Sequence, residues 1–69
     1  MRRYYKVKDP SWAIFTFAKD DQDPADVSYV HNRGVGTWKR VRGATTFEEL
    51  LTSNKLYELT HAELVLDLL

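Results

Sequence analysis

The chain has 69 residues, ten Lys or Arg, ten Asp or Glu and no Cys, so its formal net charge at pH 7 is zero. A chain of this length is expected to form one domain, residues 1–69, and the absence of Cys excludes disulfides, thiolate nucleophiles, cysteine-based zinc sites and iron–sulfur clusters. There is no apolar run near the roughly 18 residues of a membrane span and no signal-peptide segment, so we expect a cytoplasmic protein without membrane contact.

The formal charges are sorted along the chain. Residues 1–43 contain nine Lys or Arg against five Asp, a net charge of +4, whereas residues 44–69 contain Lys55 against five acidic residues, a net charge of −4. Opposite charges gathered in two parts of a small domain steer encounters and select partners. The sequence therefore predicts a basic half and an acidic half with different binding properties.

The first half has the alternation and the aromatic and β-branched content that are typical of strands. In residues 27–32, for example, Val27, Tyr29 and His31 fall on one face of an extended chain. Four strands are predicted, at residues 3–8, 12–19, 27–32 and 37–42. The expected connections are a turn at 9–11, an acidic loop at 20–26 and a glycine-containing turn at 33–36.

The second half has the signals of helix starts. Thr46 with Glu49, and Thr60 with Glu63, match a capping box, in which an N-cap hydroxyl and a carboxylate three residues later exchange hydrogen bonds with backbone N–H groups. The first pair predicts a helix that residues 53–55 bring to an end. The second pair predicts a terminal helix that runs to the last residue.

Residues 56–59 are compatible with either a short strand or an irregular turn. A block of strands followed by a block of helices indicates an α+β fold. We therefore expect a small four-stranded, mostly antiparallel sheet, covered on one face by two short C-terminal helices.

The predicted terminal helix is apolar over about 200° of its circumference, twice the width that a core-facing surface helix needs. One side can pack on the sheet. The other side is covered either within the same chain, by the helix that contains Phe47 and by residues 56–59, or by a second copy or a foreign partner, because large exposed apolar patches are rare on monomers. The residues predicted for an oligomer interface are Leu64, Val65, Leu66, Leu68 and Leu69.

Residues 33–42 combine four cations with one Trp and contain no acid. Cations beside an aromatic side chain on a hairpin can contact phosphates and stack a base. The alternation leaves open whether Trp38 lies in the core or on an exposed platform, and the zero net charge favours the core, since nucleic-acid-binding domains are usually strongly basic. The candidate nucleic-acid-binding residues are Arg33, Trp38, Lys39, Arg40 and Arg42.

No motif in the chain assembles a catalytic or metal site. The acidic loop at 20–26 lacks the turning Gly and the closing Glu of an EF-hand calcium loop. The histidines His31 and His61 lack the further ligands of a di-iron or a deaminase centre. Gly34 and Gly36 complete no dinucleotide-binding motif, and a fold of this size offers little volume for a pocket. We therefore expect no enzyme activity, no cofactor and no metal.

The sequence best fits a small protein-binding module that occupies a surface of a larger partner. A basic partner surface, including one that normally holds nucleic acid, would complement the acidic half. Compact inhibitors made by phages and mobile elements, anti-CRISPR proteins among them, often have this character, and the expectation of such an inhibitor rests on that class alone. The alternatives are direct nucleic-acid binding and a homodimeric subunit of a larger assembly. The candidate partner-binding residues are Glu48, Glu49, Glu58, Glu63 and Asp67.

Overall fold

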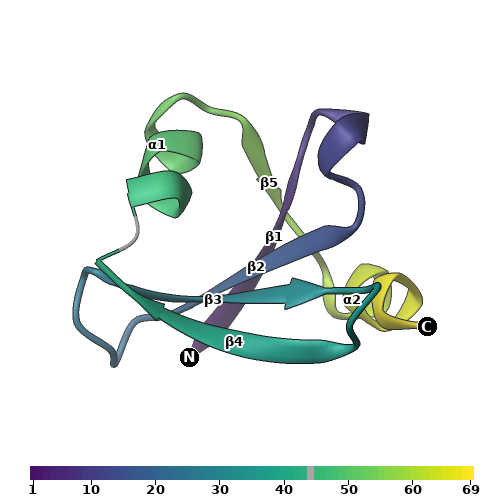
Figure 1. The fold of residues 1–69 in the computed structure, drawn as a ribbon, viewed down its shortest axis with the longest axis horizontal. Coiled ribbons are helices and arrows are strands. Elements are labelled where there is room, and N and C mark those ends of the chain that lie inside the picture. Colours follow the sequence, from purple (N-terminus) through teal and green to yellow (C-terminus); the bar gives the residue numbers. More distant parts are fainter. Residues whose placement is uncertain (44) are drawn as a thin grey trace.

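The computed structural model describes residues 1–43 and 46–69 in full and residue 45 by its backbone. Its centre is a five-stranded antiparallel sheet with the strand order β4-β3-β2-β1-β5 (Figure 1). Two helices accompany the sheet, so the predicted α+β class is confirmed. The strands are β1 (Arg2–Val7), β2 (Phe15–Asp20), β3 (Val27–Asn32), β4 (Thr37–Arg42) and β5 (Leu56–Glu58).

The prediction of four strands was wrong by one. Leu56–Glu58, which the sequence left open between strand and turn, is the edge strand β5 and pairs with β1. Leu56 lies opposite Val7, and both side chains are buried. The pairing joins segments that are far apart in sequence, and a three-residue strand is too short to show a clear alternation. Local periodicity therefore could not identify it.

The second strand begins later than predicted. Pro10–Trp12 forms a turn of 3₁₀ helix, in which the Asp9 carboxylate accepts a hydrogen bond from the Ser11 N–H at 3.0 Å. Pro suits the first position of such a turn because its fixed φ is already helical. Trp12 thus lies outside the strand, with its ring centroid 5.8 Å from that of Phe15. β3 and β4 begin and end where the sequence predicted.

The strand register divides the side chains between two faces of the sheet, because successive residues of a strand point in opposite directions. Tyr5 lies opposite Phe17, and Phe17 lies opposite Val30, so these side chains share one face. The other face carries the next residues along each strand, among them Tyr4, Ala18, Tyr29 and Arg40.

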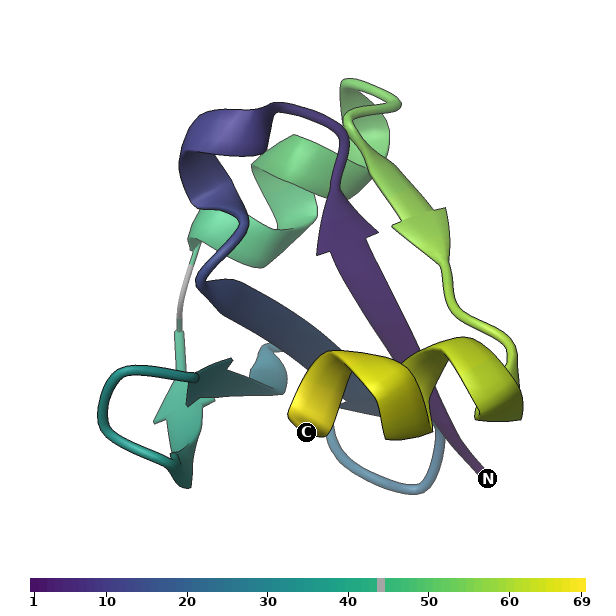
Figure 2. The same cartoon turned by 90° about the vertical axis from the view of Figure 1, so that its right-hand side faces the viewer.

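The two helices lie on opposite faces of the sheet, as Figures 1 and 2 show. α1 (Thr45–Thr52) covers the face that carries Tyr5, and α2 (His61–Leu68) lies across the face that carries Lys6. We call these the α1 face and the α2 face. The expectation that both helices cover the same face was therefore wrong. Only α2 is C-terminal to all the described strands, because α1 lies between β4 and β5. Neighbouring residues of β1 therefore contact different helices.

The hydrophobic core lies between α1 and the sheet. Val7, Phe17, Phe47 and Leu56 form its buried cluster. The Phe47 ring lies edge-on to Tyr5, with 5.6 Å between centroids, and 6.1 Å from the ring of Phe17. Edge-to-face aromatic pairs add to the free energy gained by burial of their area. A single Phe of α1 thus joins the helix to β1 and β2.

The two predicted capping boxes have different outcomes. At the start of α2 the box is confirmed, since the Thr60 hydroxyl accepts from the Glu63 N–H at 3.2 Å and the Glu63 carboxylate accepts from the Thr60 N–H at 2.9 Å. α1 begins at Thr45, so Thr46 lies inside the helix and not at its cap. Residue 44, which precedes α1, lies outside the described residues.

α1 ends where the sequence predicted, and the structure shows how. Asn54 adopts a left-handed conformation with φ 56°. Its N–H donates to the Leu51 carbonyl at 3.1 Å, and the Lys55 N–H donates to the Leu50 carbonyl at 2.9 Å. This is a Schellman motif, which satisfies the last carbonyls of a helix and turns the chain. The turn directs the following residues along β1 as β5.

Candidate functional site

A buried ion pair holds α2 on the sheet. Lys6 Nζ lies 2.9 Å from Asp67 Oδ1, and the two side chains keep only 10% and 15% of their surface exposed. Lys6 Nζ also donates to the carbonyls of Ala13 at 2.6 Å and Phe15 at 3.0 Å, and the Thr16 hydroxyl donates to Asp67 Oδ2. A buried ion pair is stable only when its remaining donors and acceptors are satisfied. These contacts meet that condition.

The surroundings of Asp67 keep its carboxylate ionised. Burial acts to raise the pKa of Asp67, but hydrogen bonds from Thr16 and Lys6 and the positive charges of Lys6 and Arg33 outweigh it, so the pKa is lowered from its ordinary value. The sequence grouped Asp67 with the acidic partner-binding residues. The structure instead places its carboxylate on the sheet side of α2, in contact with β1 and β2.

The outer side of α2 is apolar and exposed. Leu66 and Leu69 keep 71% and 91% of their surface exposed, and Val65 and Leu68 keep 48% and 39%. All residues of α2 are described, and none of them is buried. We call Val65, Leu66, Leu68 and Leu69 the α2 outer face. The sequence left open whether α1 covers this side, and α1 packs on the opposite face of the sheet.

Tyr57 extends the apolar surface from α2 onto β5. Its side chain is 43% exposed, and it lies on the α2 face, opposite Lys6 in the register. Tyr57, Leu59 and Leu66 line an open depression of about 370 Å³ beside the helix, together with four charged residues, Lys6, Arg33, Glu63 and Asp67. The exposed apolar residues of α2 therefore continue into a neighbouring strand.

The other acidic residues of the second half do not form one face. Glu48 and Glu49 are exposed on α1, whereas Glu63 is on α2, across the sheet. Glu58 is exposed on β5, at the sheet edge. Hydrogen bonds from the backbone and side chain of Thr60 lower the pKa of Glu63. Of these residues only the neighbours Glu48 and Glu49 form a compact acidic pair.

The sheet also divides the predicted nucleic-acid-binding residues. Trp38, Arg40 and Arg42 lie on the α2 face, and Lys39 lies on the α1 face. Arg33 lies in the turn between β3 and β4. The structure therefore brings together three of the five residues on one surface and places the fourth on the other side of the same strand.

Trp38 belongs to a small aromatic cluster on the α2 face, which also contains Tyr4 and His31. The Trp38 ring lies edge-on to Tyr4, with 5.7 Å between centroids, and 5.1 Å from His31. Trp38 and Tyr4 are half-buried, and His31 is buried with no hydrogen-bond partner at Nδ1 among the described residues. The fully buried Ala18 leaves room for these rings on the strand between them.

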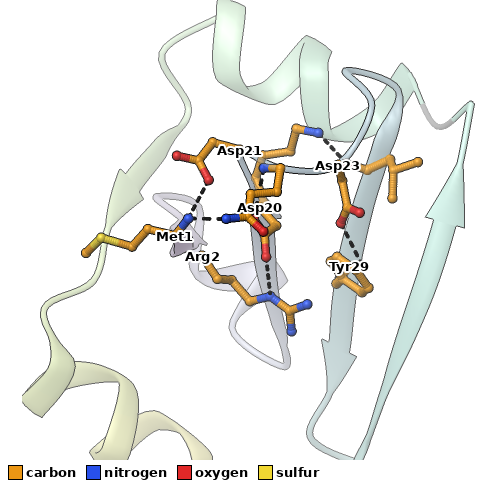
Figure 3. A network of polar contacts seen from close by, with 9 residues as sticks. Met1, Arg2, Asp20, Asp21, Asp23 and Tyr29 are labelled. Atoms are coloured by element: carbon orange, nitrogen blue, oxygen red, sulfur yellow. Dashed lines mark hydrogen bonds and ion pairs between the residues drawn. The ribbon is translucent and has the colours of Figure 1, made fainter.

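The acidic loop between β2 and β3 folds back onto the start of the chain, as Figure 3 shows. The Met1 amino group donates to Asp21 and lies 3.7 Å from Asp20, and Arg2 Nε lies 4.0 Å from Asp20. The hydrogen bond raises the pKa of the Met1 amino group and lowers that of Asp21. Sequence reasoning predicted only an acidic loop here and missed these contacts, because they join residues about 20 positions apart in the chain.

Tyr29 joins the same network to β3. Its hydroxyl donates to Asp23 at 2.7 Å, and the Arg2 guanidinium carbon lies 4.2 Å from the centroid of its ring (Figure 3). This distance is within the range of a cation–π contact. The network therefore engages Asp20, Asp21 and Asp23 within the molecule.

In the described part of the chain, no group of three or more His, Asp or Glu side chains lies close enough together to hold a metal ion. Neither of the described helices has the length and apolar content that a membrane crossing requires. No protein-family model matches the chain, and no match was found among curated proteins or solved structures.

Proposed function

We propose that the chain is a small non-catalytic protein-binding module, and that its contact surface is the α2 outer face together with Tyr57. The observation that supports this is the exposure of Leu66 on a two-turn helix that Asp67 anchors to the sheet, and of Leu69 directly after the end of that helix. Contiguous exposed apolar side chains on a small domain mark binding surfaces.

The proposed partner carries an apolar groove that receives α2. Ala62, Leu66 and Leu69 have the i, i+4, i+7 spacing by which an amphipathic helix inserts one row of side chains into a groove. Full burial of a leucine side chain contributes about 1.5–3 kcal/mol. Leu66 and Leu69 are therefore expected to contribute most of the binding free energy.

A substitution on the α2 outer face tests the proposal. Leu66→Asp is expected to weaken binding to the partner about 10- to 100-fold, which corresponds to the loss of one buried leucine. Val35→Asp is the matched control, because Val35 is 69% exposed in the turn between β3 and β4. The partner is first isolated from nuclease-treated lysate with wild-type and Leu66→Asp baits, and the affinities are then measured by calorimetry with purified proteins.

The control also determines how each result is interpreted. A partner that binds the wild type and Val35→Asp equally, and Leu66→Asp more weakly, supports the proposal. Equal loss of binding in both variants contradicts it. Sedimentation of the purified chain from about 10 μM to about 1 mM covers the affinities at which a second copy could be the partner. A dimer that Leu66→Asp dissociates makes the module a homodimeric subunit.

The class of the partner remains a prediction from the sequence. Glu48 and Glu49 are exposed on α1 and could complement a basic surface, such as that of a nucleic-acid-handling complex which this chain would inhibit. Replacing both with Lys is expected to slow association with such a partner and to flatten its salt dependence. Unchanged association would exclude this acidic pair from the contact.

A further inference from the structure

β4 is an edge strand of the described sheet, and all its charged residues are cations. Residues 33–43 contain three Arg, one Lys and no Asp or Glu. Arg40 projects from the α2 face and Lys39 from the α1 face, and both side chains are exposed. Positive charge therefore borders both sides of one open sheet edge.

These edge cations differ from the lysines of the inner strands. Lys6 is paired with Asp67, and Lys19 donates to two backbone carbonyls at 2.6 and 2.7 Å. In the described part of the chain, Lys39 and Arg40 form no ion pair and donate no side-chain hydrogen bond. Cations on an edge also discourage the addition of another strand. Their charges remain available to an external anion.

An aromatic surface lies beside these charges. Trp38 precedes Arg40 by two residues on the α2 face, which places the two side chains about 7 Å apart along the strand. The contacts of Trp38 with Tyr4 and His31 hold the indole in one orientation, so little ordering is needed when a ligand binds. Exposed bases stack on aromatic side chains of this kind while neighbouring cations contact phosphates.

From this juxtaposition we propose that the β4 edge binds single-stranded nucleic acid, with a base on the indole of Trp38 and phosphates at Arg40 and Lys39. An acidic peptide satisfies the cations but makes no use of the indole. A duplex keeps its base faces stacked inside, where Trp38 cannot reach them. The site lies on β4 and includes no residue of the α2 outer face, so it does not depend on the proposed protein binding.

The positions of the acidic residues define the extent of the site. Glu48 and Glu49 lie on α1, and Asp67 is ion-paired. Arg42 is close to the acidic loop, because the Gly43 N–H donates to the Asp26 carbonyl at 2.9 Å. We therefore place the phosphate contacts at Arg40 and Lys39 and not at Arg42.

Fluorescence anisotropy with a labelled oligothymidylate of about 15 nucleotides tests the site. Two phosphate contacts on a single strand give a slope of about −1.4 for log K against log salt, so raising salt from about 50 to about 200 mM weakens binding about sevenfold. Lys39→Glu/Arg40→Glu is expected to abolish this binding. Lys8→Glu/Lys55→Glu is the control, because it changes the net charge by the same amount beside β5, at the opposite edge of the sheet. This variant is expected to retain most of the oligonucleotide binding.

Tryptophan fluorescence tests the stacking. Trp12→Phe leaves Trp38 as the sole Trp, and its emission is expected to fall as the oligonucleotide binds. The inference is overturned by the absence of binding at low salt, by equal loss in the two charge-reversed variants, or by unquenched emission. Equal binding of a polyglutamate peptide of the same length assigns the edge to acidic peptides instead, and tighter binding of duplex assigns it to phosphate contact alone.

Discussion

Asp67→Asn tests whether one buried ion pair holds α2 on the sheet. Removal of one partner from a buried pair costs about 3–5 kcal/mol, because the other charge stays buried. Lys6 is 8% exposed, and in the Asp67→Asn variant it keeps its hydrogen bonds to the Ala13 and Phe15 carbonyls, which partly compensate its charge. We therefore expect the free energy of unfolding to fall by about 2–3 kcal/mol, at or below the lower end of that range. A domain of this length is stable by only about 3–10 kcal/mol.

Urea unfolding and amide hydrogen exchange measure this effect at two levels. Urea unfolding gives the change in global stability from the shift of the midpoint at constant m-value. Hydrogen exchange shows whether α2 opens locally. If the free energy of this local opening falls by about 2 kcal/mol, the amides of α2 are protected roughly 30-fold less. The amides of α1, which lies on the other face of the sheet, are expected to keep their protection from exchange if only α2 detaches.

The pH dependence of the effect has a defined sign. The pKa of Asp67 is lowered in the folded protein, so its contribution is fully present above the unfolded carboxyl value of about 4 and is lost as the pH falls through the lower folded value. The Asp67→Asn variant has no carboxyl group at this position, so its unfolding free energy is expected to lack the part of the decrease at low pH that protonation of Asp67 causes.

Two controls make the test of the ion pair decisive. Lys6→Met/Asp67→Leu removes both charges and is expected to recover most of the lost stability, since a buried pair can be replaced by apolar side chains. Glu48→Gln, an exposed substitution on α1, is expected to change nothing measurable. If Asp67→Asn is as mild as Glu48→Gln, the ion pair does not hold α2 and the reasoning is refuted.

Further substitutions test other contacts by the same urea assay. Thr60→Ala removes the hydroxyl that accepts from the third N–H of α2 and is expected to cost about 1 kcal/mol, whereas Thr60→Ser is expected to cost much less. Asn54→Ala removes the polar side chain whose local hydrogen bonding helps Asn to adopt the left-handed conformation, and it is expected to cost about 1 kcal/mol of unfolding free energy. Asn54→Gly removes the Cβ as well and is expected to be neutral or stabilising, and equal values for the two variants would contradict the role of φ. Phe47→Ala is expected to lower the free energy of unfolding by about 3–5 kcal/mol and to unfold much of the protein at 37 °C. Near-ultraviolet circular dichroism measures this unfolding as a loss of signal, and a native spectrum would place the core elsewhere.

Local chemistry in the sequence was sufficient to identify several features. The alternation of residues 27–32 predicted both ends of β3 and the shared face of Val27, Tyr29 and His31. The Thr60–Glu63 capping box predicted the start of α2. These signals are local because a strand's alternation and a helix cap involve residues that are close together in the chain.

Tertiary structure alone decided which segments and charges meet. β5 exists because Leu56 packs beside Val7, and the helices lie on opposite faces because Tyr5 and Lys6, neighbours in β1, point to opposite sides. Asp67 carries the same formal charge as Glu48 in the sequence, yet only Asp67 meets a buried ammonium. The amino-acid order thus determined the local elements and the supply of charge and apolar surface. Long-range pairing determined which of these became internal and which, like Leu66 and Arg40, stayed exposed, because burial depends on neighbours that are distant along the chain.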